Sequence, residues 1–391
     1  MKRTDPILVD NSLSLVNRTG AYFIARDICA ELVPSVADVR HWRLGAVAPE
    51  GLARKILARL MMFEISWLKD SPRFRIGDGT GKHRLRLFLD PLYVLRSRLE
   101  REDIVLCHDI GPLTHGALYH PKTVENYRVA YDGIARKKPG MVFVSDWTKE
   151  RFEARFGSDF RFLKTIPLYM RSELLDGPAE PLPGLEGPFF LTVGAFETRK
   201  NQSSAILAYH DSGLYSRGVR FVLCGAHGSG HEEILECAAR TPGVIVPGYV
   251  PDAQLRWLYR HAEAFVLPSL LEGFGMPALE AAYMGLLPIV SKESALVEAV
   301  DGICLQVDPM DRRSIGAAME QALARTDKER SAMSELLHRT ARRATREKYF
   351  AAWRDLLEEE DGTAIDEDRF PAHPSAAVRD LLPMSGPLDC L

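Results

Sequence analysis

The sequence has 391 residues, of which 46% are hydrophobic and 26% are charged. That length allows two domains of ordinary size, and the composition is that of a soluble globular protein. The formal net charge of −3 gives no reason to expect a nucleic-acid partner. The six cysteines are scattered without a C-x-x-C pair, which favours buried free thiols and a cytoplasmic location. No apolar run approaches the roughly 20 residues of a membrane span, and the first residues lead into no signal-peptide core.

Short apolar runs alternate with helical patterns along most of the chain, and this alternation predicts an α/β protein with doubly wound parallel sheets. Residues 176–188 are rich in Pro and Gly and form a linker by composition. The expected strands are residues 7–9, 104–107, 141–144, 189–193, 221–224, 244–246, 264–267 and 287–290.

A turn is expected at residues 17–20, between the first strand and a helix predicted over residues 21–32. A loop that leads from strand to helix at the start of an α/β domain usually points at the ligand crevice. Gly20 is therefore a candidate ligand-contacting residue, and a plain helix-entry glycine is an equally good interpretation.

Residues 51–101 are unusually basic, with twelve Lys and Arg against five acidic residues. The segment begins with a strongly apolar helix formed by Leu52, Ile56, Leu57, Leu60, Met61 and Phe63. A basic amphipathic segment suits a peripheral membrane contact or a phosphorylated acceptor. The alternative is a core helix followed by solvated basic edge strands.

The stretch 264–284 predicts a buried strand, a glycine-rich loop and then a helix. Glu272 and Glu280 stand eight residues apart in it, Glu272 in the loop and Glu280 in the first turn of the helix, a turn that Pro277 also suits. A helix N-terminus attracts phosphate, and carboxylates beside such a site can accept hydrogen bonds from sugar and ribose hydroxyls. Alternatively, both glutamates are ordinary surface acids.

Residues 272–280, Glu-Gly-Phe-Gly-Met-Pro-Ala-Leu-Glu, resemble the E-G-F-G-x-P-x-L-E hallmark of the retaining glycosyltransferases of family 4 and match every fixed position. The resemblance implies the GT-B fold, in which two Rossmann-like doubly wound parallel-sheet domains face a central crevice. It also implies an acceptor-binding domain at 1–180, a nucleotide-sugar-binding domain at 181–345, and a segment 346–391 whose helix returns to the first domain.

Two basic residues also match the family. Val193-Gly194 and Arg199-Lys200-Asn201 resemble its Val-Gly-x4-Arg-Lys-Asn pattern, which implies that Lys200 holds the donor diphosphate. Arg199 is expected to replace the arginine that many members have directly after the glycine, where this chain has alanine. Adjacent cations oppose the dipole at a helix N-terminus, and a bound anion would explain them.

A His-Asp pair follows the strand predicted at residues 104–107. His108 matches the family histidine that lines the donor sugar pocket, whereas Asp109 is expected to support its loop. Residues 248–252 match Gly-x-Val-x-Asp, whose backbone meets the nucleobase, and this match adds Tyr249 and Val250 to the candidates.

The resemblance implies transfer of a hexose from a nucleotide sugar with retention of anomeric configuration. Glu272 is expected to hold sugar hydroxyls and Glu280 the ribose hydroxyls. No Asp-x-Asp metal site is apparent at a strand end, so we expect a reaction without metal or cofactor, in which cations stabilise the leaving diphosphate. The further donor-binding candidates are Gly194, Gly273, Phe274, Gly275 and Met276.

The Arg-Lys-Asn form resembles mannosyl- and rhamnosyltransferases of bacterial polysaccharide assembly, which makes GDP-mannose the first expectation for the donor. UDP- and dTDP-linked sugars are the alternatives, and the expected acceptor is a saccharide or a polyprenyl-linked saccharide. Two other functions fit the same fold, namely a nucleotide-sugar epimerase or phosphorylase and a non-catalytic partner of another glycosyltransferase.

Overall fold

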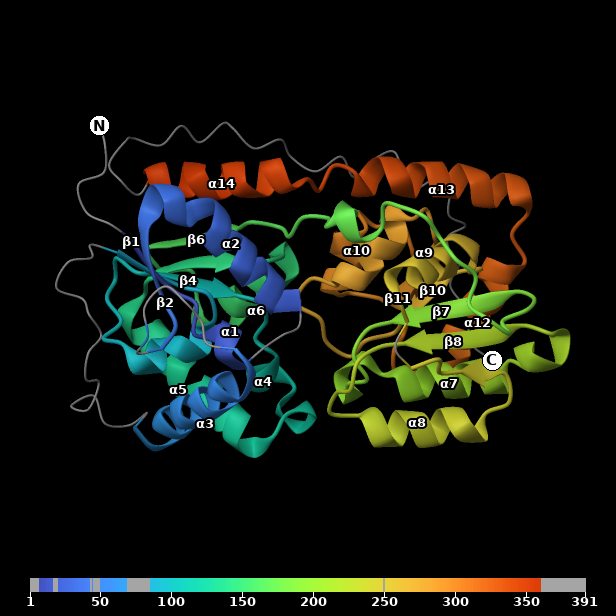
Figure 1. Ribbon diagram of the computed structural model, residues 1–391, viewed down its shortest axis with the longest axis horizontal. Coiled ribbons are helices and arrows are strands. Elements are labelled where there is room, and N and C mark those ends of the chain that lie inside the picture. The colour runs from blue at the N-terminus through green and yellow to red at the C-terminus, as the bar shows by residue number, and fades with distance from the viewer. Residues whose placement is uncertain are drawn as a thin grey trace, which may run out of the picture.

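The computed structural model describes residues 7–16, 20–42, 44, 50–68, 85–248 and 250–359. Two α/β domains lie side by side, and each is built on a six-stranded parallel sheet covered by helices (Figure 1). This arrangement confirms the predicted fold class. Residues 17–19 of the turn expected at 17–20 and the basic residues between 69 and 84 lie outside the described residues.

The first sheet has the strand order β2-β1-β3-β4-β5-β6, and all its pairs are parallel. Its strands are β1 (Ile7–Asp10), β2 (Ala37–Arg40), β3 (Leu85–Phe88), β4 (Ile104–Cys107), β5 (Gly140–Phe143) and β6 (Phe162–Thr165). Strands β1, β3, β4 and β5 are fully buried, because helices cover both faces of a parallel sheet. The loops after β4 and β5 face the second domain.

The second sheet has the order β12-β11-β10-β7-β8-β9, again with parallel pairs. Its strands are β7 (Phe189–Val193), β8 (Arg220–Cys224), β9 (Val244–Ile245), β10 (Phe265–Leu267), β11 (Pro288–Ser291) and β12 (Leu305–Val307). The order reverses between β7 and β10, and ligands of open α/β sheets bind at the carboxyl ends of strands at such a switch point.

Helices surround both sheets (Figure 1). Those of the first domain are α1 (Leu13–Val16), α2 (Gly20–Val36), α3 (Gly51–Leu68), α4 (Gly111–Thr114), α5 (Pro121–Lys137) and α6 (Asp146–Phe156). Those of the second domain are α7 (Gln202–Asp211), α8 (His231–Arg240), α9 (Asp252–His261), α10 (Met276–Tyr283), α11 (Ala295–Ala299), α12 (Arg312–Leu323) and α13 (Asp327–Ala341). Helix α2 was predicted over residues 21–32, but it begins at Gly20 and continues to Val36.

A last helix, α14 (Arg346–Glu359), follows α13 and lies along the first domain (Figure 1). Residues 342–345 separate it from α13. The guanidinium of Arg346 bridges α14 to α2, at 3.2 Å from the Asp27 carboxylate and 3.1 Å from that of Glu31. Trp353 is fully buried beneath the helix.

The structure contradicts the alternative interpretation of residues 51–101, namely a core helix followed by solvated edge strands. Strand β3 lies inside the first sheet between β1 and β4, and Arg86 in it is buried in a 2.7 Å ion pair with Asp103. Helix α3 buries only part of its apolar surface: Met61 is buried, whereas Leu52 is 74% exposed.

Replacing Trp353 with alanine should destabilise the protein by about 3–5 kcal/mol, because truncation of a buried tryptophan leaves a cavity. The midpoint of thermal or urea unfolding measures this loss. Trp67 on α3 is 73% exposed, so Trp67→Ala is a matched control that should change stability by no more than about 0.5 kcal/mol. Equal effects of the two substitutions would contradict the docking of α14.

Candidate active site

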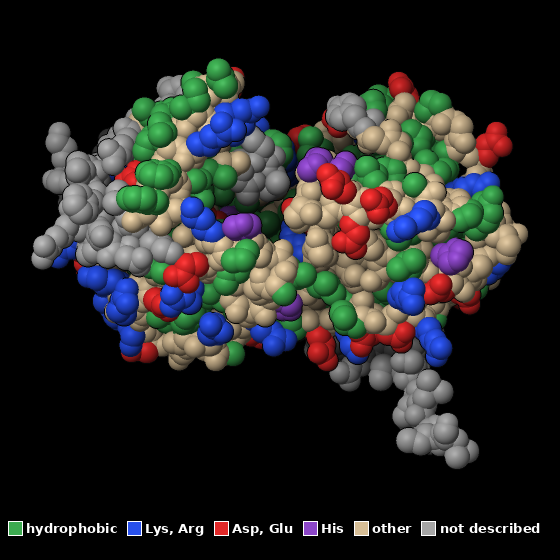
Figure 2. Space-filling model, turned by 90° about the horizontal axis from the view of Figure 1, so that it is seen from below, with side chains coloured by type: hydrophobic (Ala, Val, Ile, Leu, Met, Phe, Trp, Pro, Cys, Tyr) green, Lys and Arg blue, Asp and Glu red, His purple; other side chains and the backbone are tan. Residues whose placement is uncertain are grey.

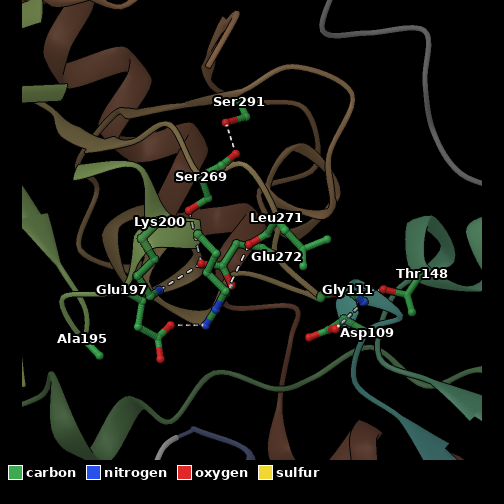
Figure 3. A network of polar contacts seen from close by, with 12 residues as sticks. Asp109, Gly111, Thr148, Ala195, Glu197, Lys200, Ser269, Leu271, Glu272 and Ser291 are labelled. Carbon is green, nitrogen blue, oxygen red and sulfur yellow. Dashed lines mark hydrogen bonds and ion pairs between the residues drawn. The ribbon is translucent and has the colours of Figure 1, made fainter. Parts of the chain in front are cut away.

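An ionic cluster lies at the switch point of the second sheet (Figure 3). The carboxylate of Glu272, in the loop after β10, accepts a hydrogen bond from Arg199 Nη1 at 2.7 Å and another from Lys200 Nζ at 2.9 Å. Both cations belong to a short 3-10 helix, Thr198–Lys200, in the loop after β7. Two loops that follow neighbouring strands therefore meet through opposite charges.

The carboxylate of Glu272 is only 9% exposed, yet it is held in its ionised form. Burial acts to raise the pKa of Glu272, but the charges and hydrogen bonds of Arg199 and Lys200 together outweigh burial and hold this pKa at about 2. Glu197 adds a second carboxylate, 2.7 Å from the Arg199 guanidinium, so two acids balance two cations. The anions that neutralise the adjacent cations in this structure are therefore two side chains of the protein itself.

Gly273 brings the same loop against the first domain. A Cβ atom at this position would lie 1.9 Å from the carbonyl oxygen of His108, so a side chain cannot be accommodated. The carbonyl oxygen of Gly273 accepts hydrogen bonds from the hydroxyls of Ser145 at 2.6 Å and Thr148 at 3.1 Å. The loop that carries Glu272 is thus held by both domains.

Helix α10 begins directly after this loop. Gly275 has a φ of 103°, in the left-handed region, and a Cβ there would lie 2.4 Å from Leu296, so glycine is required on both grounds. Phe274 is buried and Met276 is the first helical residue. Pro277 lies in the first turn, as expected from the sequence.

Glu280 lies in the second turn of α10 rather than in the first turn predicted for it. Its carboxylate accepts a hydrogen bond from the hydroxyl of Tyr259 on α9 at 3.0 Å. Burial raises the pKa of Glu280 to about 7, although the hydrogen bond from Tyr259 and the charge of Arg171 act to lower it. Tyr259 was not among the predicted site residues, because a tyrosine hydroxyl leaves no separate signal in a periodic pattern.

His108 follows β4, where its Nε2 lies 3.1 Å from the carbonyl oxygen of Leu89. A carbonyl oxygen can only accept, so Nε2 carries the proton and Nδ1 is left as an acceptor. Burial lowers the pKa of His108, which favours the neutral ring. The carboxylate of Asp109 accepts from the Gly111 backbone N–H at 2.7 Å and supports this loop.

The remaining candidates lie in different surroundings. Gly194 adjoins the cluster, since a Cβ on it would lie 3.1 Å from Lys200 Nζ. Val250 is half-buried just before α9, whereas Gly20 is exposed as the first residue of α2. Tyr249 lies outside the described residues. Contact of these four residues with a nucleotide sugar stays a prediction.

Glu298 is an interface residue that was not among the site residues predicted from the sequence. It lies on α11 of the second domain, and its carboxylate accepts from the backbone N–H groups of Asp146 at 2.7 Å and Trp147 at 2.9 Å. These N–H groups begin α6 of the first domain, where a helix N-terminus favours a negative charge. Glu298 therefore joins the two domains beside the loop of Glu272.

A cavity of about 380 Å³ opens between the domains next to the cluster. Asp109 and Thr148 line it from the first domain, and Ser269 and Glu272 line it from the second (Figure 3). A larger cleft of about 600 Å³ surrounds Glu298, but its walls carry several further acids, which would repel a diphosphate. Among the described residues no group of three or more His, Cys, Asp or Glu is placed to hold a metal ion.

Part of the chain matches a known protein family, and the chain is similar to known mannosyltransferases. Residues 179–337 match the family described as glycosyl transferases group 1. The chain is 31% identical over 251 residues to O-antigen chain mannosyltransferase B of Escherichia coli, a match that covers 61% of this chain and 65% of that protein. It is 34% identical over 145 residues to the serotype-specific mannosyltransferase WbdA of E. coli, covering 36% of this chain and 18% of that protein. The chain thus spans less than two thirds of the length of either relative.

Solved structures share the whole architecture. Sucrose-phosphate synthase from Thermosynechococcus elongatus has a TM-score of 0.67 at 17% identity, covering 91% of this chain and 98% of that one. A UDP-forming α,α-trehalose-phosphate synthase from Burkholderia xenovorans has a TM-score of 0.61 at 13% identity. That match covers 92% of this chain and 98% of the synthase chain. Identities this low concern the fold alone, and they confirm the predicted GT-B arrangement.

Substitution of Glu280 by glutamine should make the protein's stability less sensitive to pH. The pKa of Glu280 is about 7 in the folded state against 4.5 for an ordinary glutamate, so the folded state binds more protons and stability falls as pH rises through this interval. Relative to wild type, Glu280→Gln should therefore be more stable at about pH 8 than at about pH 4, by up to about 3 kcal/mol.

Urea unfolding at a series of pH values measures the effect. Tyr259→Phe removes a hydrogen bond that lowers the pKa of Glu280, so this variant should lose more stability than wild type over the same interval. Parallel pH curves for all three proteins would show that Glu280 is not buried in its neutral form.

Proposed function

We propose that this protein is a retaining glycosyltransferase that moves a hexose from a nucleotide sugar to a saccharide acceptor. The observation that carries the proposal is the cluster of Glu272, Lys200 and Arg199 at the switch point, beside an interdomain cavity. The match of residues 179–337 to the glycosyl transferases group 1 supports it independently.

Lys200 and Arg199 are the groups that would receive the donor diphosphate. When the bond from the anomeric carbon to the diphosphate breaks, negative charge develops on the leaving oxygen, and cations held in place beforehand stabilise that charge. Because both cations pair with Glu272 in this structure, the diphosphate has to share them or take them over. Glu272 is then released towards the hydroxyls of the donor sugar.

The acceptor hydroxyl would attack the anomeric carbon from the face that the diphosphate leaves, which retains the configuration. A new bond forms between the acceptor oxygen and that carbon, and the hydroxyl proton leaves with the diphosphate. His108, neutral and with Nδ1 as an acceptor, is suited to a hydroxyl of the donor sugar. Glu280 would accept hydrogen bonds from the ribose hydroxyls.

GDP-mannose is the donor we propose, because two relatives of this chain carry the name mannosyltransferase. The acceptor we propose is a saccharide, carried on a polyprenyl lipid during polysaccharide assembly. The similarity to an O-antigen chain mannosyltransferase supports this choice of acceptor.

Opposite substitutions in the ion pair should have different effects on binding and transfer. Lys200→Met removes a charge that contacts the diphosphate, so kcat/KM should fall about 10²-fold or more and nucleotide binding should weaken. Glu272→Gln keeps the size of the side chain but frees the two cations, so transfer should be lost while the nucleotide diphosphate binds at least as tightly. Steady-state kinetics and isothermal titration calorimetry separate these effects.

Lys328→Met, on the exposed start of α13, is the matched control and should leave both measurements unchanged. Because Lys200→Met and Glu272→Gln each break a buried ion pair, circular dichroism spectra first have to show that these two variants are folded. Wild-type kinetics in folded Lys200→Met would remove Lys200 from the reaction.

Among the nucleoside diphosphates GDP, UDP and dTDP, GDP should raise the melting temperature most, because a ligand that binds only the folded state stabilises it. The same shift should be absent in Lys200→Met. With GDP-mannose and an oligosaccharide acceptor, NMR should find the product in the anomeric configuration of the donor. Free mannose, an epimerised donor or a sugar phosphate as the product would favour an epimerase or phosphorylase instead.

A further inference from the structure

Helix α3 exposes an apolar stripe. Eight large apolar side chains are exposed among the described residues, and five of them belong to this one helix. These five are between 49% and 74% exposed and are Leu52, Ile56, Leu60, Phe63 and Trp67. Their spacings of four, four, three and four residues place them on a single face of the helix.

The opposite face of α3 anchors the helix to the first domain. Met61 and Ile65 are buried there, and the Arg54 guanidinium donates a hydrogen bond at 2.6 Å to the carbonyl oxygen of Leu15 in α1. The exposure of the stripe is therefore not caused by a detached helix. An exposed apolar face on a helix whose other face is already packed against its domain indicates an interaction site.

The exposed charged side chains beside the apolar stripe of α3 are basic. Lys55 and Arg59 are exposed on its flank, while the carboxylate of Glu64, the one acidic side chain of α3, accepts a hydrogen bond from the indole of Trp42. The whole chain carries a net charge of −3, so this cationic region is set apart from the average surface. Figure 2 views the side on which α3 lies in Figure 1, and hydrophobic and basic side chains adjoin each other on the first domain.

We propose that this face of α3 docks on the surface of an anionic lipid bilayer. Apolar side chains between cations and aromatic rings are the pattern of helices that lie in the plane of a membrane interface. Phe63 and Trp67 stack with their ring centroids 5.4 Å apart, and aromatic rings of this kind favour the level of the lipid headgroups. Lys55 and Arg59 meet the negative charge of the lipid phosphates.

The geometry favours a lipid surface over a second copy of the chain. In a two-fold symmetric dimer through α3, the same patch meets itself, so the exposed Lys55 and Arg59 of both copies would lie in one contact. The helix is about 27 Å long, which is the length of a contact that lies along the surface. Among the described helices, none is long and apolar enough to cross a bilayer.

The test is co-sedimentation of the full chain with vesicles, without nucleotide or sugar, so its result is independent of the proposed transfer reaction. The protein should bind vesicles of phosphatidylglycerol and phosphatidylcholine and bind pure phosphatidylcholine much more weakly. Phe63→Ser/Trp67→Ser should weaken binding about tenfold or more, because the apolar contact is reduced. Lys55→Glu/Arg59→Glu should weaken binding to the anionic vesicles by roughly 25-fold or more.

Matched controls come from the far side of the molecule. Lys328→Glu/Arg339→Glu reverses two exposed cations on α13 and should leave vesicle binding unchanged, as should Met310→Ser, which removes an exposed apolar side chain of the second domain. Tryptophan emission should shift to the blue when anionic vesicles are added, and Trp67→Phe should bind them with a smaller shift.

Three outcomes would overturn the proposal: no binding of the wild type to anionic vesicles, equal binding of the α3 and α13 charge variants, or wild-type binding by Phe63→Ser/Trp67→Ser. A dimer in sedimentation velocity that Phe63→Ser/Trp67→Ser dissociates, without vesicle binding by wild type, would assign the stripe to a second copy.

Discussion

The ionised carboxylate of Glu272 is the group on which the arrangement of the crevice depends. A buried carboxylate without partners is costly, and here Lys200 and Arg199 compensate for the water it has lost. Because the cations follow β7 and the carboxylate follows β10, the ion pairs can form only when these two strands are neighbours. The reversal of strand order in the second sheet thus supplies both the site and its charge balance.

Contacts between the domains position the same loop from its other side. Gly273 lies against the His108 carbonyl because it has no side chain, and Glu298 meets the N-terminus of α6. Neither contact involves the cations. If a diphosphate competes with Glu272 for Lys200 and Arg199, as we propose, these contacts would hold the loop in place and let the ion pairs exchange without the domains separating.

The elements predicted from the sequence match the structure more closely in the second domain than in the first. The second domain follows regular alternation, with buried strands close to the predicted ranges, and its motif places Glu272 and Lys200 in loops that the structure brings together. In the first domain, one of the two interpretations of residues 51–101 was a core helix followed by solvated edge strands. Arg86 is instead buried against Asp103, and Leu52 is exposed. Periodicity shows that a helix is amphipathic but not which of its two faces meets protein.

By itself the sequence determined the α/β class, the loop-and-helix form of residues 268–283 and the residue types of the ionic cluster, because these depend on local periodicity, proline and glycine. The tertiary structure alone decided that Glu272 pairs with the two cations, that Glu280 is half-buried beside Tyr259 with a raised pKa, and that Glu298 caps a helix of the other domain. Each of these contacts joins residues 21 to 152 positions apart, so it forms only when folding brings them together, and the loss of water around them strengthens it.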